Sequence, residues 1–310
     1  FNGTAYTNII GGAASTVIPF TTQLGSDIDG EAANDQSGQS VSLSSDGTIL
    51  AIGTEWNDGN GSSSGHVRVY QYSAGTWSQL GSDIDGEAAG DQSGQSVSLS
   101  SDGTILAIGA PSNGSYSGHV RVYQYSSGSW SQLGSDIDGE ATNDRSANSI
   151  SLSSDGTILA IGAYRNGGNG YNSGHVRVYE YSGGSWSQLG SDIDGEAAGD
   201  YSGRSVSLSS DGTILATGTG YNDGNGSNSG HVRVYEYSGG SWSQLGSDID
   251  GEAAENYSGN TISLSSDGTI LAIGAEGNAD NGSNSGHVRV YEYSGGSWSQ
   301  LGSDIDGEAA

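Results

Sequence analysis

The chain has 310 residues with 55 glycines, two prolines and no cysteine, which excludes a disulfide framework and a proline-rich linker. Thirty-six acidic residues stand against eight basic ones, and the formal charge of −28 argues against nucleic acid or an anionic membrane as a partner. No apolar run approaches the roughly 20 residues that cross a bilayer, so we expect no membrane insertion.

The first 20 residues match no other part of the chain and are interpreted as an apolar N-terminal tail. The sequence begins at Phe1 and contains no methionine, which favours a processed, extracellular protein, secreted or held at the cell surface. The apolar side chains of the tail are expected to be buried, either against its own domain or against the next molecule. The second alternative predicts a head-to-tail homo-oligomer or filament. The predicted assembly residues are Phe1, Tyr6, Ile9, Ile10, Val17, Ile18 and Phe20.

Residues 21–310 are interpreted as one repeat domain. The string Gly-Ser-Asp-Ile-Asp-Gly-Glu-Ala recurs with its first glycine at 25, 81, 134, 190, 246 and 302. The spacing is 56 residues except for one step of 53, where a surface loop is three residues shorter. The chain therefore contains five units and a partial sixth from 302.

Each unit is predicted to form four β-strands, as the first unit shows. Residues 40–44 alternate in polarity, and an Asp-Gly turn at 45–48 follows them. Residues 49–52 form a short apolar run, 66–72 alternate again, and 77–84 form the fourth strand. No segment has helical spacing.

Four antiparallel strands repeated five times predict an all-β fold, a five-bladed β-propeller with an N-terminal extension. The alternative is an open β-solenoid. Side chains such as Val41, Leu43 and Val67, with their copies, are predicted to be buried between blades. Residues 23–28 are a further copy of the fourth strand, one more than a closed five-bladed ring holds, so we expect this copy to pair elsewhere.

The units resemble the FG-GAP repeat of integrin-type propellers. The resemblance lies in Ser37-Gly-Gln-Ser-Val41, Leu50-Ala-Ile-Gly53 and Gly65-His-Val-Arg-Val-Tyr70, and it extends over all five units. The chain is also similar to secreted proteins built from tandem Trp-x-Gln-Leu-Gly and Asp-Ile-Asp-Gly-Glu-Ala units. Serine stands where the family has phenylalanine, and a Ser-Ser-Asp-Gly-Thr turn replaces the family's calcium loop.

Six Asn-x-Ser/Thr sequences predict N-glycosylation. Four of them fall in the same long loop of their units, which would place a ring of glycans on one face. The alternative is turn chemistry, since Asn-Gly pairs suit positive φ angles. The six residues are Asn2, Asn60, Asn113, Asn225, Asn256 and Asn281.

The acidic segment of each unit places carboxylates at alternate positions, a pattern that suits an oxygen-binding cation. No cofactor is required by the sequence, and calcium is the metal that this pattern favours. Alternatively, the carboxylates are solvated or pair with arginine. The candidate ligands are Asp27, Asp29, Glu31 and Asp35, followed by Asp83, Asp85, Glu87 and Asp91.

One arginine and one histidine recur inside a strand of every unit. The arginines are predicted to be structural, paired with aspartates of the adjacent loops, because a buried guanidinium is best satisfied by a carboxylate. Fivefold repetition argues against a catalytic histidine, since an active site needs one asymmetric arrangement. No residue is therefore predicted to be catalytic. The structural arginines are Arg68, Arg121, Arg177, Arg233 and Arg289.

These patterns favour a secreted, non-enzymatic structural or adhesive propeller, a glycoprotein subunit of an extracellular filament whose partner is another copy of itself. The alternative is a multivalent, calcium-dependent module that binds carbohydrate or protein, with glycans or surface proteins as partners. Equivalent units suit both functions, because both gain from repeated surfaces.

Overall fold

The computed structural model describes residues 23–308, and nearly all of its regular structure is β-strand. The one helical segment, α1 (Asn113–Tyr116), is a four-residue turn in the shortened loop. Within the described part of the chain, no helix is long and apolar enough to span a membrane. The predicted assembly residues of the N-terminal tail, 1–20, lie outside the described residues.

The first blade contains four antiparallel strands in the order of the sequence. They are β1 (Ser40–Leu43), β2 (Ile49–Thr54), β3 (His66–Ser73) and β4 (Thr76–Gln79). A two-residue strand, β5 (Ile84–Asp85), also pairs with β3, at its other end. The predicted four-stranded antiparallel blade is confirmed.

The other four blades repeat this arrangement. The second contains β6 (Ser96–Leu99), β7 (Ile105–Ala110), β8 (His119–Ser126), β9 (Ser129–Gln132) and β10 (Ile137–Asp138). The third contains β11 (Ser146–Leu152), β12 (Ile158–Ala163), β13 (His175–Ser182), β14 (Ser185–Gln188) and β15 (Ile193–Asp194). The fourth contains β16 (Ser205–Leu208), β17 (Ile214–Thr219), β18 (His231–Ser238), β19 (Ser241–Gln244) and β20 (Ile249–Asp250). The fifth contains β21 (Ser258–Leu264), β22 (Ile270–Ala275), β23 (His287–Ser294), β24 (Ser297–Gln300) and β25 (Ile305–Asp306).

The predicted fourth strand, residues 77–84, is interrupted. After β4 the chain turns away at Gly81, which has a φ of +81° and lies against the next blade, where a Cβ would be 2.8 Å from Cδ1 of Trp130. The Trp130 indole N–H donates to the carbonyl of Leu80 at 2.8 Å. The strand is broken because this segment links two blades, a tertiary demand that strand periodicity does not reveal.

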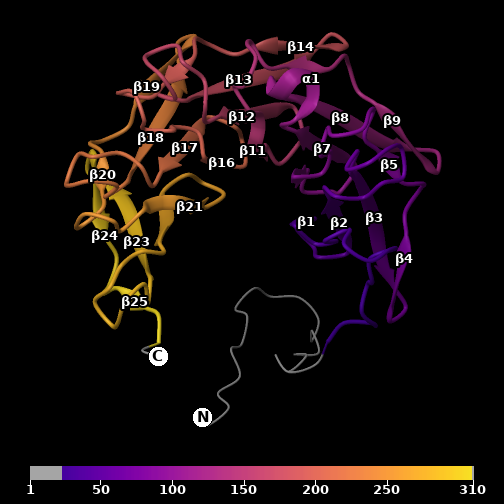
Figure 1. Cartoon of the computed structure of the whole chain (residues 1–310), viewed down its shortest axis with the longest axis horizontal. Coiled ribbons are helices and arrows are strands. Elements are labelled where there is room, and N and C mark those ends of the chain that lie inside the picture. The colour runs from indigo at the N-terminus through magenta and orange to yellow at the C-terminus, as the bar shows by residue number, and fades with distance from the viewer. Residues whose placement is uncertain (1–22, 309–310) are drawn as a thin grey trace.

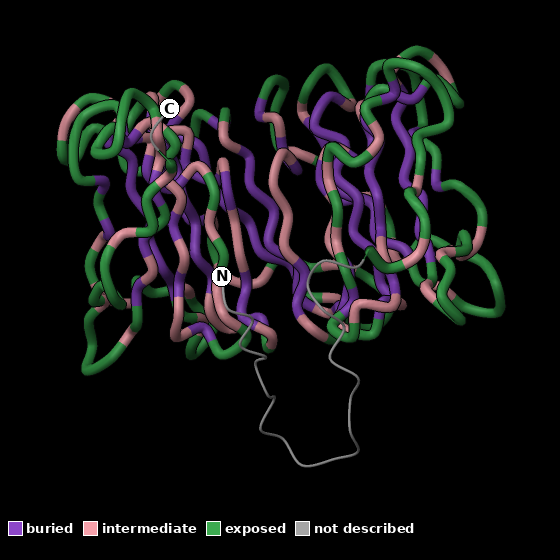
Figure 2. The backbone as a smooth tube through the Cα atoms, turned by 90° about the horizontal axis from the view of Figure 1, so that it is seen from below, coloured by how far each residue is buried: buried purple, intermediate pink, exposed green. Residues whose placement is uncertain are grey.

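Neighbouring blades pack through apolar faces. In the first interface Val67 and Val69 of one blade meet Leu106 and Ile108 of the next, and all four side chains are buried. Each of the three following interfaces has an equivalent cluster. Burial of these faces supplies the core that a single thin blade lacks. Figure 2 shows the buried segments running along the strands and the exposed ones at the loops.

A chain of backbone hydrogen bonds joins the turns of successive blades. The N–H of Ser45 donates to the carbonyl of Ser101, and the same bond links Ser101 to Ser154, Ser154 to Ser210 and Ser210 to Ser266, each at 2.8 Å. Four such bonds connect five blades in a row. Within the described residues, no fifth bond returns from Ser266 to Ser45.

The blades form an open arc, with a gap between β21–β25 and β1–β5 (Figure 1). The side chains at the two ends are accordingly exposed: Val41 by 61% and Leu43 by 57% in the first blade, and Ile305 by 61% in the fifth. Copies of these residues elsewhere, such as Leu99 and Ile84, are buried. The predicted burial of Val41 and Leu43 is therefore wrong, because no blade covers them.

The additional strand copy, residues 23–28, lies on the first blade and forms no strand. The carbonyl of Leu24 accepts the indole N–H of Trp77 at 2.9 Å, as Leu80 does for Trp130 of the second blade. This copy therefore occupies, on the first blade, the place that an interblade segment occupies on every later one.

The Ser-Ser-Asp-Gly-Thr turns predict a response to acid. In the fifth turn the Asp267 carboxylate accepts bonds from the Ser265 hydroxyl at 2.6 Å and the Thr269 N–H at 3.1 Å, and these bonds lower the pKa of Asp267 to about 2. Because the folded-state pKa lies below the ordinary 3.8, the stabilisation is present above that value and is lost as pH falls toward 2.

We expect the thermal unfolding midpoint to fall over this range. The fall should be smaller in a variant with all five turn aspartates changed to asparagine, and circular dichroism melts at several pH values measure it. An unchanged pH dependence in that variant would contradict the assignment. The five residues are Asp46, Asp102, Asp155, Asp211 and Asp267, and the pKa of each is lowered.

Candidate functional site

A buried His and Arg mark the start of the third strand in every blade. In β3, His66 and Arg68 lie two residues apart, so strand alternation places them on one face. The Arg68 side chain donates from Nη2 to the carbonyl of Asp29 at 2.7 Å, while its Nη1 lies 3.7 Å from Oε1 of Glu31. The guanidinium also stacks over the Tyr70 ring, 5.6 Å from its centroid.

This geometry differs from the predicted pairing of arginine with an aspartate carboxylate. Asp29 contributes its backbone carbonyl, and Glu31, two residues further along, contributes the carboxylate. The second blade repeats the contact, with Arg121 at 2.8 Å from the carbonyl of Asp85 and 3.6 Å from Glu87. Each arginine therefore ties its strand to the segment that arrives from the previous repeat.

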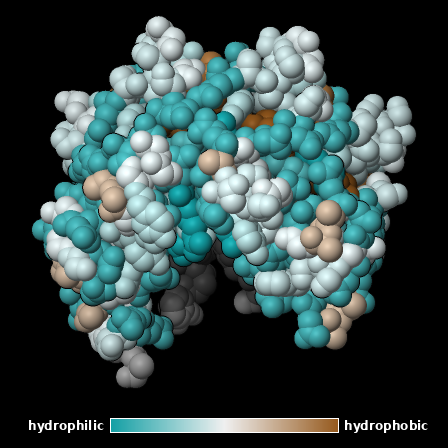
Figure 3. Space-filling model, turned by 45° about the horizontal axis from the view of Figure 1, so that its top comes forward, coloured by the Kyte–Doolittle hydropathy of each residue, from teal (hydrophilic) through white to brown (hydrophobic). Residues whose placement is uncertain are grey.

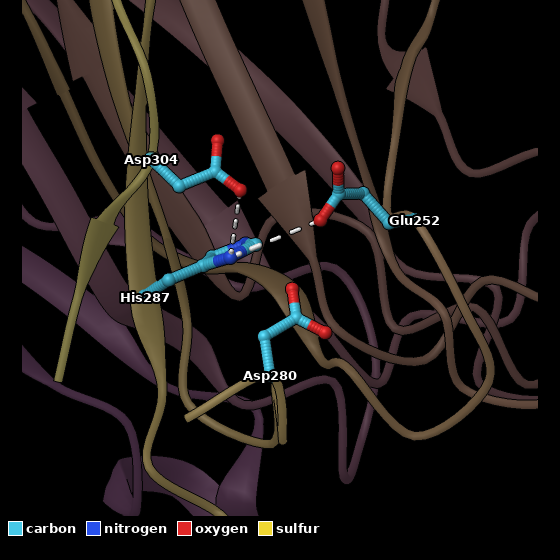
Figure 4. A group of neighbouring side chains, drawn as sticks. All are labelled: Glu252, Asp280, His287 and Asp304. Atoms are coloured by element: carbon cyan, nitrogen blue, oxygen red, sulfur yellow. Dashed lines mark ion pairs between the residues drawn. The ribbon is translucent and has the colours of Figure 1, made fainter. Parts of the chain in front are cut away.

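The histidine of each blade faces two carboxylates that arrive from different segments. In the fifth blade, Nδ1 of His287 lies 3.8 Å from Oε2 of Glu252 and 3.6 Å from Oδ2 of Asp304 (Figure 4). Glu252 belongs to the segment before the blade, and Asp304 lies in the segment between β24 and β25. A fourth group, Asp280, approaches from the long loop. The five groups are Glu31, His66 and Asp83; Glu87, His119 and Asp136; Glu140, His175 and Asp192; Glu196, His231 and Asp248; and Glu252, Asp280, His287 and Asp304.

Burial shifts the pKa of three of these histidines. Desolvation lowers the pKa of His119 and His175, and it lowers the pKa of His231 to about 4. These imidazoles are therefore neutral at pH 7. The His287 side chain is only 1% exposed, and among the described residues its buried Nδ1 atom has no hydrogen-bond partner.

The predicted calcium ligands of the first unit do not converge. Asp27 accepts a bond from Gln23 at 2.8 Å, and the buried Asp35 accepts bonds from the Ala32 N–H and the Asn57 amide. Of Asp27, Asp29, Glu31 and Asp35, only Glu31 enters a described group. The carboxylates of one segment point to different partners, because each satisfies a separate part of the fold.

The second predicted set is divided in the same way. Asp83 joins the group of the first blade and Glu87 that of the second, while Asp85 gives its carbonyl to an arginine and Asp91 accepts the Ala88 N–H at 2.9 Å. Sequence reasoning missed the histidines as partners. The available signal was the fivefold recurrence of a Glu, a His and an Asp at nearly constant spacing.

The asparagines of the Asn-x-Ser/Thr sequences have structural roles in the described residues. Asn256 is 4% exposed and its Oδ1 accepts the Ala253 N–H at 2.6 Å, so the fold uses this side chain as a buried hydrogen-bond acceptor. The amide of Asn60 donates to the carbonyl of Gly86 at 2.8 Å. Asn169 makes the same contact although Gly170-Tyr171 follows it, so the hydrogen bond explains the residue without a glycan.

The other glycosylation candidates divide into three cases. Asn225 and Asn281 also donate to backbone carbonyls, at 2.8 and 2.7 Å. Asn113 begins α1 in the shortened loop. Asn2 lies outside the described residues. The shared bond fixes the long loop against the acidic segment, so both lie at the same end of the blade.

Shallow grooves recur where the acidic segment passes the tryptophan. In the fifth blade, a groove of about 270 Å³ is lined by residues 247–250, Tyr291, Ser297 and Trp298. The first and fourth blades have equivalent grooves of about 290 and 230 Å³. Figure 3 shows that the surface around the arc is predominantly hydrophilic, in keeping with its charge.

Comparisons with known proteins agree with this architecture. Similar solved structures include TolB from Acinetobacter baumannii (16% identity, TM-score 0.51, covering 87% of this chain and 54% of that one). A putative 6-phosphogluconolactonase from Bacteroides uniformis is 15% identical (TM-score 0.60, 88% and 73% covered). Hydrazine synthase from Kuenenia stuttgartiensis is 16% identical (TM-score 0.56, 92% and 69% covered). At these identities the likeness concerns the fold alone.

The chain spans about half the length of the TolB structure that it matches. No curated protein matches it in sequence. The model of the FG-GAP repeat matches residues 28–70, which confirms the resemblance seen in the first unit. Residues 28–70 thus match the FG-GAP repeat, in a chain whose fold is that of a β-propeller.

Proposed function

We propose that this chain is a non-enzymatic structural unit that assembles head to tail through the two exposed ends of its arc. The observation that carries the proposal is that the two ends are the two halves of one interface. The first blade exposes Val41 and Leu43, and the fifth exposes Val288 and Ile305. In the four internal interfaces the copies of these side chains pack against one another.

The glycines of the fifth blade support this pairing. At Gly65 an added Cβ would lie 2.1 Å from the carbonyl oxygen of Ser93 in the next repeat, so only glycine permits the contact. Gly286 is its copy, yet the nearest atom to an added Cβ there is 3.4 Å away. A groove of about 340 Å³, lined by Gly286, Val288 and Ile305 among others, occupies this end. The fifth blade therefore has the shape that receives another repeat.

A second copy of the chain fits against the exposed face of the fifth blade, because its first blade provides the other half of an interblade interface. Residues 23–33 and 300–310 have the same sequence, so the C-terminal segment of one copy can replace the equivalent segment on the first blade of the next. This exchange replaces each contact by an identical one. The favourable free energy of association therefore comes from the apolar faces that are newly buried.

The heterologous contact continues indefinitely unless its rotation closes a ring, so we propose a filament. The hydrophilic, acidic surface fits a protein that works outside the cell in a structural or adhesive role. The absence of enzymatic activity is supported by the equivalence of the five His and carboxylate groups, since catalysis needs one distinct arrangement. The lactonase and hydrazine synthase share only the fold.

Sedimentation of the purified chain tests the proposal. We expect species larger than a dimer, favoured by salt because the charge of −28 makes copies repel. Ile305→Asp should weaken association more than tenfold, since the interface would bury a carboxylate. Tyr171→Asp is the matched control, because Tyr171 is 82% exposed and lies away from both ends. Equal behaviour of the two variants would exclude the end-face contact.

The recurring grooves favour a second candidate function, multivalent binding of carbohydrate. Each places a tyrosine and a tryptophan beside aspartates, and in the fifth blade these aromatic residues are Tyr291 and Trp298. Aromatic faces and carboxylates together suit sugar rings. A glycan array with Ile305→Asp, with and without chelator, tests it: binding by this unassembled variant supports the module, and its absence leaves assembly as the function.

A further inference from the structure

We propose that each blade binds one first-row transition-metal dication through the histidine Nδ1, one glutamate oxygen and one aspartate oxygen. The inference does not depend on head-to-tail assembly, since each complete group lies within a single chain. In the fifth blade the ligands are Glu252, His287 and Asp304, with Asp280 as a fourth group.

One nitrogen and two carboxylate oxygens converge in each group. In the fifth blade, Nδ1 of His287 faces carboxylate oxygens at 3.8 and 3.6 Å, which is close to the separation of ligands around a bound ion and too long for a hydrogen bond. The imidazole is buried, and no atom in residues 23–308 forms a hydrogen bond with Nδ1. With its proton on Nε2, the imidazole presents an Nδ1 lone pair to the two carboxylates, and a cation among these three groups would relieve their mutual repulsion.

The two oxygens of the glutamate carboxylate have different neighbours. In every blade one oxygen, Oε2, faces the histidine, and the other, Oε1, faces the arginine. For Glu252 the arginine is Arg289, at 3.5 Å. Metal-binding carboxylates are oriented in this way by an outer partner on the oxygen that does not bind. The arginine therefore has a positioning role in addition to its structural one.

The donor set decides the class of metal. Calcium and magnesium take six or more oxygens and rarely accept imidazole, whereas Zn²⁺, Co²⁺ and Ni²⁺ bind mixed nitrogen and oxygen sets. Three protein ligands leave a position for water in four blades, and Asp280 approaches that position in the fifth. The predicted preference for calcium is thus replaced by a preference for zinc-like ions.

Bound metal would crosslink segments of each blade that are distant in the sequence. Glu252 lies in the segment before the fifth blade, His287 starts β23, and Asp304 lies in the segment between β24 and β25. A metal that joins the three holds both interblade segments against one strand. Because it binds the folded chain and not the unfolded one, it raises the unfolding temperature with its concentration.

Titration of the chelator-treated chain with ZnCl₂ tests the proposal. Isothermal calorimetry should give five equivalents of Zn²⁺ that excess CaCl₂ does not displace. Co²⁺ should show the visible absorption of a nitrogen- and oxygen-bound ion. His287→Gln should remove one equivalent, from five to four, and Asp304→Asn, at a more exposed ligand, should do the same if the histidine variant folds poorly.

Tyr171→Asp is the control for surface charge and should keep all five equivalents. The proposal is overturned if Zn²⁺ does not bind, if Ca²⁺ displaces it at equal concentration, or if both ligand variants retain five equivalents. Loss of binding at high salt in every variant would also overturn it, since that result identifies a diffuse attraction to the acidic surface.

Discussion

Gly174→Ala is expected to destabilise the chain severely, whereas the same substitution at Gly286 leaves most of the folding stability intact. The two glycines are copies with φ angles of +73° and +68°. At Gly174 an added Cβ would lie 2.1 Å from the carbonyl oxygen of Ser202 and 2.5 Å from its nitrogen, both backbone atoms of the next repeat. At Gly286 no atom lies within 3.3 Å.

The shared positive φ angle costs each variant about 1 kcal/mol. The clash adds about 3 kcal/mol or more at Gly174 alone, because the blades must separate to relieve it. Urea denaturation measures the difference through the unfolding midpoints. Equal losses of stability in the two variants would show that the fifth blade is covered in the same way as the third, which contradicts an open end.

Gly286→Ala also separates folding from assembly. The added methyl group occupies the position that the next repeat would approach, so this variant should remain folded and lose head-to-tail association. Sedimentation at equal concentrations of the variant and the unchanged chain measures the effect. A folded Gly286→Ala chain that still assembles would argue against the fifth blade as the receiving end.

Mixing two variants, each with a substitution that disables one end face, is expected to give dimers and nothing longer. Val41→Asp disables the first blade, and Ile305→Asp disables the fifth. Each variant alone has no complementary partner, so it should remain monomeric. Together they form one intact interface, between the fifth blade of the first variant and the first blade of the second.

The dimer is the discriminating outcome, because only a head-to-tail contact between two different faces predicts it. A twofold contact would let at least one variant pair with itself. Size-exclusion chromatography with light scattering gives the masses, and a chain carrying both substitutions is the control, which should not pair with either variant. Filaments from the mixture, or dimers of one variant alone, would contradict a head-to-tail contact.

Much of the fold can be predicted from the sequence, because the strands and turns of each unit depend on residues that are close together in the sequence. Alternation in residues 66–72 and the turn at 45–48 depend on neighbours a few residues away, and both are observed. Closure of the ring depends instead on the rotation from one blade to the next, which spacing does not encode. The exposure of Val41 and Ile305 therefore could not be predicted.

The candidate site was only partly predictable for a similar reason. Glu31 was identified as a ligand from its acidic neighbours, but its partners His66 and Asp83 belong to other segments. Sequence proximity favoured Asp27 and Asp29, whose side chains do not join a group. Strand pairing brings the true set together, because β5 returns to the start of β3 and so carries the following segment toward the histidine.

Electron microscopy of the purified chain tests head-to-tail assembly most directly. The predicted result is filaments in which every arc points the same way, with the fifth blade of one copy against the first blade of the next. Isolated arcs at all concentrations and salt levels, or pairs related by a twofold axis, would contradict it.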